Sequence, residues 1–582
     1  MIRRNVFSSV LLFTALALLA GCVHPLDRKL DHKLAAQMVT NNRAYLKAMR
    51  RAEEIAISRP PSQVLEELED RLDELEKISG STANEAEQIG LGPDLMGDVK
   101  IKSVAMSLQR VLKLATENNL SGKLARLVPA VRDSQLVQAE AVFDATYFAN
   151  FNLQKQDTPQ PATQLGLDQF GSVQQDTRAL ETGIRKILTT GGQISVSTTF
   201  TRNRRDPSFF VERTFYEADV LASLQQPLLR NFGADVTTSQ IELSNNARDR
   251  AMSDLKLTLM NTLANTERVY WELVFAYQAL LANQRLNREA EEALRKIIER
   301  SIYDASSVEV SQQRAFSAET KFTLYNAQDA VRRASDQLKA LIYSSKWSVV
   351  GEELIRPLDT MADVPIHFNL YDACLTALQN RPDVQQALVD IKDSSIRQRV
   401  ADNQRLPLLD LQAQVTYQGI STSRRTDSYD ALDDGKFIDY ILALVFEMPI
   451  GNRSAEAAHK QRKIERIGAV INYRRTAQNA MLEVKSAIRQ LQTGYRQIGV
   501  ARDARLASAD TVRALRERVK AGATTDPGFI DFKIRREREM TLDEIAEIRS
   551  LADYNIAISQ YYLVIGTLLA RDGIEMVAEG RD

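Results

Sequence analysis

Apolar and polar residues alternate in two well-separated parts of the chain, and each part predicts a β-strand. Residues 143–154 read FDATYFANFNLQ and residues 409–418 read LDLQAQVTYQ. A period of two places the apolar residues on one face of a strand and the polar residues on the other. A third stretch, GIRKILTTGGQISVSTTFTRN (183–203), predicts a hairpin that turns at Gly191-Gly192 and belongs to an extra block at about 156–212.

Long helical patterns follow the strands. Each strand region ends at a proline, Pro227 in the first case and Pro449 in the second. Apolar residues then recur at spacings of three and four, as in Leu255, Leu259 and Leu263, which suits helices packed side by side. The helical stretches break near 302–310 and 520–529. Pro227 to Ala305 and Pro449 to Pro527 both span 78 residues, so we infer an internal duplication.

The N-terminus has the pattern of a bacterial export signal. Arg3 and Arg4 precede the apolar run VLLFTALALLA (10–20), and Leu-Ala-Gly-Cys follows at 19–22. This segment resembles a lipoprotein lipobox, which implies cleavage before Cys22 and lipidation (a palmitate among the acyl chains) of that residue. Val23 after the cysteine favours delivery to the outer membrane. The alternative is an ordinary signal peptide that happens to contain a cysteine.

Residues 23–105 read as a polar extension. We expect a helix over about 28–57, a break at Pro60-Pro61, and a second helix over 64–78. The second helix carries leucines at a 3-4-3 spacing that gives one apolar stripe: Leu65, Leu68, Leu72 and Leu75. A linker follows at 80–94. The extension could wrap a barrel or reach other parts of the envelope.

The composition narrows the function. The 582 residues carry a net charge of −1 and a mean hydropathy of −0.28, which exclude a polytopic helical membrane protein and give no sign of nucleic-acid binding. Cys374 is the only cysteine besides Cys22, and the four histidines are scattered. No hydrolase, metal or nucleotide motif is present, so we predict no catalytic residues, no metal site and no cofactor. An all-carboxylate site stays open.

Strands of about ten residues with one apolar face are typical of membrane β-barrels. An open sheet cannot lie in lipid, because its edge groups would lack hydrogen bonds. Four to six strands cannot close a channel-sized barrel, so several copies must share one barrel. A trimer would have twelve strands, or eighteen if the extra hairpin joins the sheet. The alternative is a soluble β-sandwich beside a coiled coil.

Several segments resemble the TolC family of outer-membrane efflux proteins. The most specific is QPLLRNFGADV (226–236), and TTGGQISVS, NRPDV, LPLLDL and MPIGNR also match. The resemblance covers roughly 106–570. It implies a mainly α fold with membrane β-strands, in which a homotrimer builds an outer-membrane β-barrel continued by a periplasmic α-barrel. It also implies passive conduction, coupled through a periplasmic adaptor (membrane fusion) protein to an inner-membrane pump, in efflux or type I secretion.

This reading divides the chain into five parts. We expect a signal peptide (1–21), the extension and linker (22–105), a first repeat (106–345, strands about 143–226), a second repeat (346–570, strands about 407–448) and a tail (571–582). Proline ends sheet pairing and glycine relaxes the backbone where a strand turns into a helix. The expected corner residues are Gln226, Pro227, Leu228, Leu229, Arg230, Gly233, Pro407, Pro449 and Gly451.

The two helix breaks should be periplasmic tips. The resemblance implies adaptor contacts and a ring of carboxylates that narrows the pore and selects cations. The matching gate positions are Glu309 and Asp531, although an acidic residue at a helix start is favoured by the helix dipole alone. The expected tip contacts are Asp304, Ala305, Gly522, Pro527 and Gly528.

The sequence therefore predicts a lipid-anchored outer-membrane channel subunit that touches outer-membrane lipid and performs no chemistry. One alternative is a periplasmic coiled-coil lipoprotein that tethers without conducting. The other is an envelope hydrolase, for which no convergent catalytic residues are visible. The arginines of the strand loops (Arg202, Arg204, Arg205, Arg424, Arg425) either face anionic lipopolysaccharide or belong to solvated loops.

Overall fold

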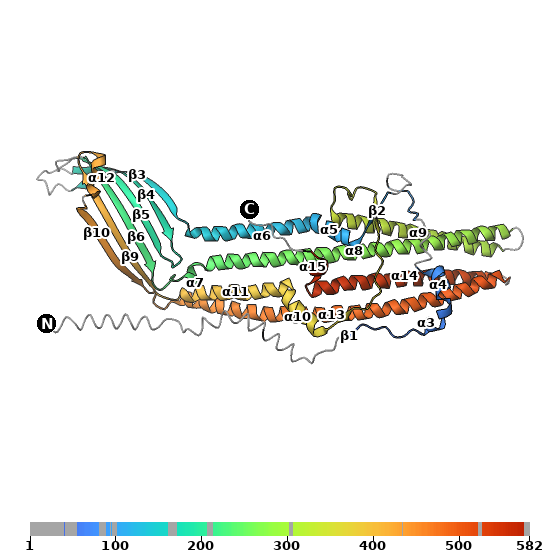
Figure 1. Cartoon of the computed structure of the whole chain (residues 1–582). Coiled ribbons are helices and arrows are strands. Elements are labelled where there is room, and N and C mark those ends of the chain that lie inside the picture. The colour runs from blue at the N-terminus through green and yellow to red at the C-terminus, as the bar shows by residue number, and fades with distance from the viewer. Residues whose placement is uncertain are drawn as a thin grey trace. The chain divides into compact units, whose positions relative to one another are not determined.

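The computed structural model describes residues 40, 55–80, 89–93, 95, 102–160, 171–206, 214–301, 306–433, 435–521 and 527–574. The chain folds into two compact units whose segments interleave in sequence. Unit 1 comprises Met1–Pro129, Ala251–Ala387 and Tyr473–Asp582, and unit 2 comprises Ala130–Arg250 and Leu388–Asn472. Figure 1 labels their helices and strands.

Unit 2 is built on one six-stranded sheet in the order β10-β9-β6-β5-β4-β3, with every neighbouring pair antiparallel. The strands are β3 (Thr146–Gln160), β4 (Gly171–Ile187), β5 (Gln193–Asp206), β6 (Thr214–Pro227), β9 (Leu408–Ser421) and β10 (Phe437–Glu447). Both alternating segments are strands, as predicted. The extra block is β4 and β5, and it lies inside the same sheet rather than outside it.

Short and long helices flank this sheet along the chain. α7 (Ala234–Thr237) and the start of α8 (Ser239–Arg300) follow β6, and α13 (Arg453–Lys520) follows β10. α6 (Leu120–Glu140) precedes β3, and α11 (Pro382–Asn403) precedes β9. α12 (Arg425–Asp433) lies between β9 and β10 in sequence and packs on β9 and β6.

Unit 1 contains two long helical hairpins. α8 pairs with α9 (Ser307–Ile342), and α13 pairs with α14 (Pro527–Val564). The shorter helices of this unit are α5 (Leu108–Asn118), α10 (Leu370–Asn380) and α15 (Leu568–Arg571). Four strands precede the first hairpin and two precede the second. The hairpins are interrupted between Arg300 and Ser307 and between Lys520 and Pro527.

Apolar stripes hold the hairpins together. Leu255, Leu259 and Leu263 are all buried, as their spacing predicted. Tyr270 is fully buried and donates its one hydroxyl proton to the Asp359 carboxylate (2.5 Å), and the backbone carbonyl oxygen of Met106 lies 3.1 Å from the same hydroxyl. Its role is therefore packing, not ligand binding, because its only polar atom is already satisfied within the fold.

Arginine–carboxylate pairs link the two hairpins within unit 1. Arg549 bonds Glu272 at 2.8 Å, and Arg516 bonds Glu289 at 2.9 Å. A third pair, Arg285 with Glu544, is almost completely buried. A buried pair favours one alignment of the two helices. Any shift that separates the partners would leave a charge buried without water or a counterion.

The N-terminal extension docks on unit 1. The helix expected over 28–57 is wrong at its end, because Ile55–Ala56 form strand β1 and pair with β8 (His367–Phe368). Backbone pairing to a distant strand overrides the local helical pattern there. α3 (Gln63–Glu67), the 3-10 turn η1 (Glu69–Arg71) and α4 (Leu72–Ser79) follow. A second small sheet pairs β2 (Ser103–Met106) in parallel with β7 (Leu354–Pro357).

The leucine stripe of this extension faces α13 and α14. Leu75 has no exposed surface and packs in one cluster with Leu506, Ala509, Val512 and Met540. The buried guanidinium of Arg505 holds the same segment, because it contacts both the Glu547 carboxylate and Glu76 of α4 (2.5 Å). Residues 57–79 are thus part of the helical unit, a position that the sequence left open.

Candidate membrane-facing sheet, corner and helix tips

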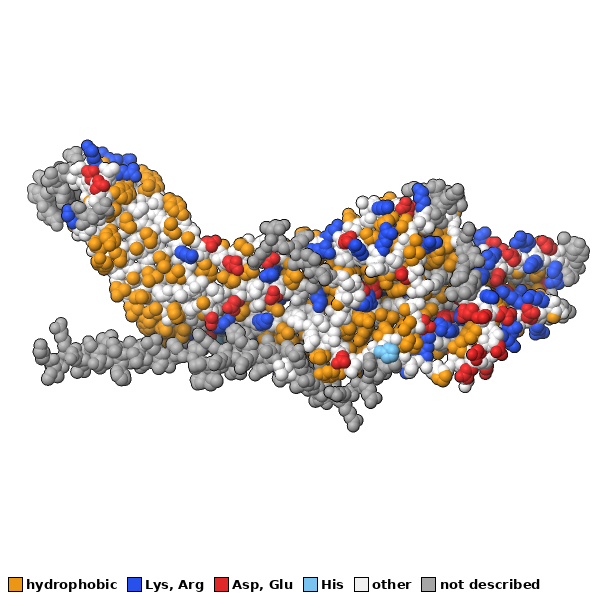
Figure 2. Space-filling model, in the orientation of Figure 1, with side chains coloured by type: hydrophobic (Ala, Val, Ile, Leu, Met, Phe, Trp, Pro, Cys, Tyr) orange, Lys and Arg blue, Asp and Glu red, His pale blue; other side chains and the backbone are white. Residues whose placement is uncertain are grey.

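The sheet of unit 2 has one apolar face, which we define by the strand register. Residues on this face lie opposite one another across all six strands, and one complete row is Tyr147, Ile184, Val196, Ala222, Val415 and Tyr440. Tyr147 is 69% exposed and Tyr440 is 72% exposed. Figure 2 shows hydrophobic side chains spread over the sheet. A contiguous apolar surface of this kind requires lipid or protein to cover it.

The opposite face, the polar face, carries hydrogen-bonding side chains. One of its rows runs Asn150, Glu181, Thr199, Asp219 and Gln418. The Asn150 amide donates to Glu181 at 3.2 Å, and the Gln418 amide donates to Asp439 at 2.7 Å. An apolar face backed by a polar one matches the pattern of a membrane barrel wall around an aqueous lumen.

Both edges of this sheet are open. Among the described residues, β3 and β10 each have one strand neighbour, so one side of each carries a row of backbone groups without a strand partner there. On β10, Leu442 is 77% exposed and Leu444 is 62% exposed. Exposed apolar edge strands invite pairing with another chain.

The corner between β6 and α8 closes on the β4–β5 turn. The Gly233 N–H donates to the carbonyl of Thr190 at 3.1 Å, and the Gln226 amide donates to the same carbonyl at 3.2 Å. Gly233 has φ +103° and Gly191 has φ +91°, conformations that side chains with a Cβ rarely adopt. A Cβ on Gly191 would lie 2.3 Å from the carbonyl oxygen of Asn231, so glycine is required there.

Pro227 ends β6 without losing a hydrogen bond. It lies beyond Gln225, the last β6 residue opposite β5. Backbone pairing with the start of β9 continues for a few residues, since Leu228 N–H donates to Leu409 (2.7 Å) and Arg230 N–H donates to Pro407 (3.2 Å). The missing N–H of proline thus falls on the side where no strand remains. Leu229 and Phe232 complete the turn through a 3.2 Å backbone bond.

Three asparagines fix the two strand-to-helix corners, and the sequence alone did not mark them. Asn403 accepts from the Asn231 N–H at 2.7 Å, and Asn452 donates to the Arg405 carbonyl at 2.9 Å. Asn231 (φ +66°) and Asn452 (φ +35°) adopt left-handed conformations, and Gly451 (φ +89°) follows Pro449 at the second corner. Asparagine tolerates left-handed conformations better than most residues do. The pairs Arg230-Asn231 and Gly451-Asn452 were therefore the sequence signal that could have marked these turns.

The tips are described only in part. Asp304, Ala305 and Gly522 lie outside the described residues, as does Cys22, and Pro527 and Gly528 begin α14. Glu309 is 5% exposed and forms a capping box with Ser306, in which the Ser306 N–H donates to Glu309 (3.2 Å). Asp531 pairs with Arg535 one helical turn away. The two gate candidates therefore differ, because one is buried in a cap and the other is on the helix surface.

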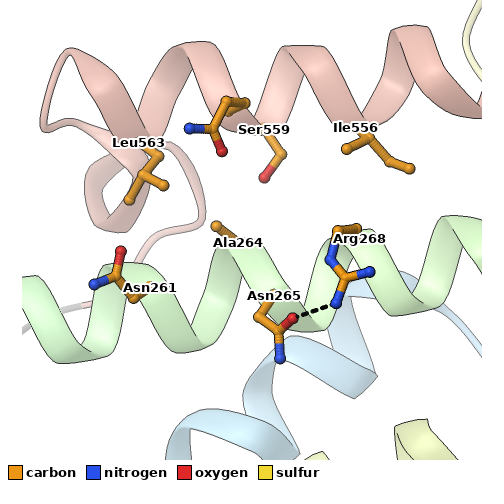
Figure 3. Close-up of a pocket in the computed structure, with 8 residues that line it drawn as sticks. Asn261, Ala264, Asn265, Arg268, Ile556, Ser559 and Leu563 are labelled. Atoms are coloured by element: carbon orange, nitrogen blue, oxygen red, sulfur yellow. Dashed lines mark hydrogen bonds between the residues drawn. The ribbon is translucent and has the colours of Figure 1, made fainter. Parts of the chain in front are cut away.

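Helix interfaces of unit 1 offer no catalytic set among the described residues. A hollow of about 210 Å³ lies between α8 and α14, where Ser559 faces Ala264 and Ile556 lies across from Arg268 (Figure 3). Arg268 donates to Asn265 there at 2.7 Å, and no carboxylate or imidazole lines the hollow. Within the described ranges, no three His, Cys, Asp or Glu side chains are placed to hold a metal ion.

No helix in the described part of the chain is long and apolar enough to cross a membrane. The sheet and the paired helical hairpins define the fold of outer-membrane channel subunits. The chain is similar to the CmeC outer membrane channel of Campylobacter jejuni (16% identity, 83% of this chain and 93% of that chain, TM-score 0.58). It is also similar to VceC of Vibrio cholerae (14% identity, 79% of this chain and 96% of that chain, TM-score 0.55). A third similar structure is the open state of the MtrE channel of Neisseria gonorrhoeae (17% identity, 79% of this chain and 89% of that chain, TM-score 0.55).

The family comparison agrees with this fold. Residues 375–526 match the family model of the outer membrane efflux protein, and no curated protein matches the chain. The match covers the second strand pair and most of the second hairpin, which confirms the TolC-like resemblance expected from the sequence. The family is described by efflux, and the CmeC and MtrE structures are outer membrane channels, in agreement with the expectation that the chain is not an enzyme.

Proposed function

We propose that this protein is one subunit of a trimeric outer-membrane channel that conducts solutes passively from periplasm to exterior. The observation that carries the proposal is the six-stranded sheet with an exposed apolar face, a polar face and two open edges. Pairing β10 of one copy with β3 of the next would satisfy both edges and close a barrel. The apolar face would then contact lipid and the polar face would line the lumen.

The apolar band is close to the height that a membrane needs. On β9 it runs from Leu409 to Tyr417, through Leu411, Ala413 and Val415, and Gly419 beyond it is buried under α12. Eight residue steps give about 27 Å along a strand, or about 21 Å along the membrane normal at a tilt of about 40°. Known outer-membrane barrels have an apolar band about 25 Å tall.

Six strands in each subunit favour the larger of the two barrels left open by the sequence. Three copies give eighteen strands, because the extra hairpin is part of the sheet. With strands about 4.8 Å apart and tilted by about 40°, eighteen strands enclose a backbone diameter of about 36 Å, against about 24 Å for twelve. The wider barrel admits larger cargo at its membrane end.

The remaining parts of the assembly follow from the same proposal. Lipidation at Cys22 anchors the chain in the outer membrane, and the helices project into the periplasm. The tips near 302–310 and 520–529 meet the adaptor, which links to the pump. Asp531, whose side chain is 44% exposed and pairs with Arg535 of the same helix, is the better gate candidate, since a ring of three such carboxylates would attract cations.

Disulfide cross-linking tests the barrel. In a Cys374→Ser background, Phe151→Cys on β3 is combined in turn with Tyr440→Cys, Leu442→Cys and Leu444→Cys on β10. We expect at least one combination to give a covalent trimer under oxidation, because edge strands of neighbouring copies bring Cα atoms within disulfide range. Ile184→Cys, inside the sheet, replaces the β3 cysteine as the matched control and should give none.

Planar-bilayer recording then separates this proposal from the tethering lipoprotein. A channel gives discrete conductance steps and trimers that survive in detergent. A water-soluble monomer without conductance, or cross-linking at Ile184 as strong as at Phe151, contradicts the proposal.

A further inference from the structure

On β4 and β5 the apolar face of the sheet gives way to cations at the strand ends away from the corner. Phe200 of β5 lies opposite Leu180 of β4, the last apolar pair on these two strands, and the following row also holds Leu153 and Tyr216 on the flanking strands. Two residues farther along both strands, on the same face, Arg202 lies opposite Arg178. Two residues cover about 7 Å of strand, so guanidinium groups follow directly on the lipid-type surface.

Two like charges opposite each other on one face destabilise a sheet unless something lies between them. Arg178 has one carboxylate neighbour, Asp176 at 3.6 Å. The Nε of Arg202 is buried and has no hydrogen-bond acceptor among the described residues. The pair therefore carries positive charge that the described part of the fold does not neutralise.

Helix α12 adds a third guanidinium to this row. Arg425 lies over the ring of Phe200, 4.5 Å from its centre, and Tyr429 stacks on the same ring at 6.2 Å. α12 approaches so closely that a Cβ on Gly419 would lie 2.1 Å from the Ser428 carbonyl. Figure 2 shows lysine and arginine side chains gathered at this end of the sheet.

The acids on this end leave an excess of cations on β3, β4 and β5. The same face carries Lys155 and Arg204 in the next row, beside Asp176 and Asp157. α12 contributes Asp427 and Asp430, and Asp427 bonds the hydroxyl of its neighbour Thr426 at 3.2 Å. We define Arg178, Arg202 and Arg425 as the arginine row.

We infer that the arginine row binds the phosphate groups of lipid head groups in the leaflet at the outer ends of the strands. This inference rests on the proposed function, which places the apolar face in the membrane. Guanidinium groups bind phosphate oxygens through paired hydrogen bonds, and a phosphate between Arg178 and Arg202 would relieve their repulsion. Aromatic rings at the hydrocarbon boundary, followed by cations at head-group depth, fit such a surface.

Lipid binding to the detergent-purified trimer tests this assignment. Diphosphorylated lipid A and its dephosphorylated form are titrated against the wild type and Arg178→Gln/Arg202→Gln, with bound lipid counted by native mass spectrometry. We expect the double variant to bind diphosphorylated lipid A at least about fivefold less well, with no change for the dephosphorylated form. Arg178→Lys/Arg202→Lys should keep part of the affinity. Lys186→Gln, exposed on the same face near the corner, is the matched control and should leave binding unchanged.

Thermal stability gives a readout that a purely structural role would not produce. Without lipid, the glutamine double variant should be as stable as the wild type or more stable, because the repulsion is gone. With diphosphorylated lipid A, only the wild type should gain stability. Equal lipid binding by the two proteins, or equal loss in Lys186→Gln, overturns the inference. Conductance in zwitterionic bilayers should not depend on the arginine row. If the wild-type protein gave no conductance there, that result would count against the proposed channel and not against lipid binding by the row.

Discussion

The backbone N–H of Gly233 bonds the carbonyl oxygen of Thr190 at 3.1 Å, which joins the strand-to-helix corner to the turn of the extra hairpin. The hydroxyl of Thr190 also donates to Gln226 at 2.8 Å. The hairpin is therefore locked at its inner end by the same residues that redirect the chain into α8. The extra strands β4 and β5 therefore widen the sheet while their turn stays hydrogen-bonded to the corner.

The first prediction concerns the two glycines of this corner. Gly233→Ala meets no atom within 4 Å and should cost about 1–3 kcal/mol from backbone strain alone. Gly191→Ala should cost more, because its Cβ would also collide with Asn231. Thermal unfolding of the trimer measures both. Gly468→Ala, in open space on α13, is the control and should be neutral or stabilising. The reverse order of the two variants would contradict this account of the corner.

The second prediction concerns the docked extension. Leu75→Ala removes a fully buried side chain and should weaken docking of residues 63–79 by about 2–5 kcal/mol. Limited proteolysis and amide exchange should show faster opening of this segment while the trimer stays intact. Leu95→Ala, at a position that is 90% exposed, is the matched control. Unchanged protection in Leu75→Ala would mean that Arg505 and its partners hold the segment without the leucine stripe.

The third prediction concerns pH. Burial raises the pKa of Glu267 from about 4.5 to about 7, although the adjacent Arg571 opposes the shift. The folded state then holds a proton that the unfolded state has released, so folding stability should fall as pH rises from about 4.5 to about 7 and level off above. The change is on the order of 3 kcal/mol.

Glu267→Gln should remove this slope, whatever its effect on absolute stability. Melting temperatures of both proteins between pH 4.5 and pH 8, taken as a difference, isolate the contribution of this one group. Parallel curves for the two proteins would show that Arg571 keeps Glu267 ionised throughout.

The fourth prediction separates a helix cap from a gate at the first tip. Ser306→Ala and Glu309→Ala each break the capping box and should destabilise the start of α9 by about 1 kcal/mol, seen as faster local amide exchange. Neither should change cation preference. Asp531→Asn should lower it, since a surface charge is lost. A changed ion preference in Glu309→Ala, with Ser306→Ala unaffected, would restore Glu309 as a gate residue.

Much of the fold could be predicted from the sequence because its signals are local. Alternation set the faces of β3 and β9, and the leucine spacing set the buried stripe of α8. Pro227 and Pro449 marked the strand ends through the absence of a backbone donor. Gly233 and Gly451 also left a signal in the sequence, because both adopt a positive φ that favours glycine. The hydrogen bond between Asn231 and Asn403 could not be predicted from the sequence, because it joins residues 172 positions apart.

Only the tertiary structure decided the strand register and the contacts between residues that are distant in sequence. Strand register placed Arg202 opposite Arg178, and a shift of β5 by one residue would have moved Arg202 to the other face. Sheet order put the extra hairpin inside the six-stranded sheet, and a buried Leu75 fixed the extension on α13. Local pattern determines which face of an element is apolar, but the choice of neighbour depends on packing between residues that are distant in sequence.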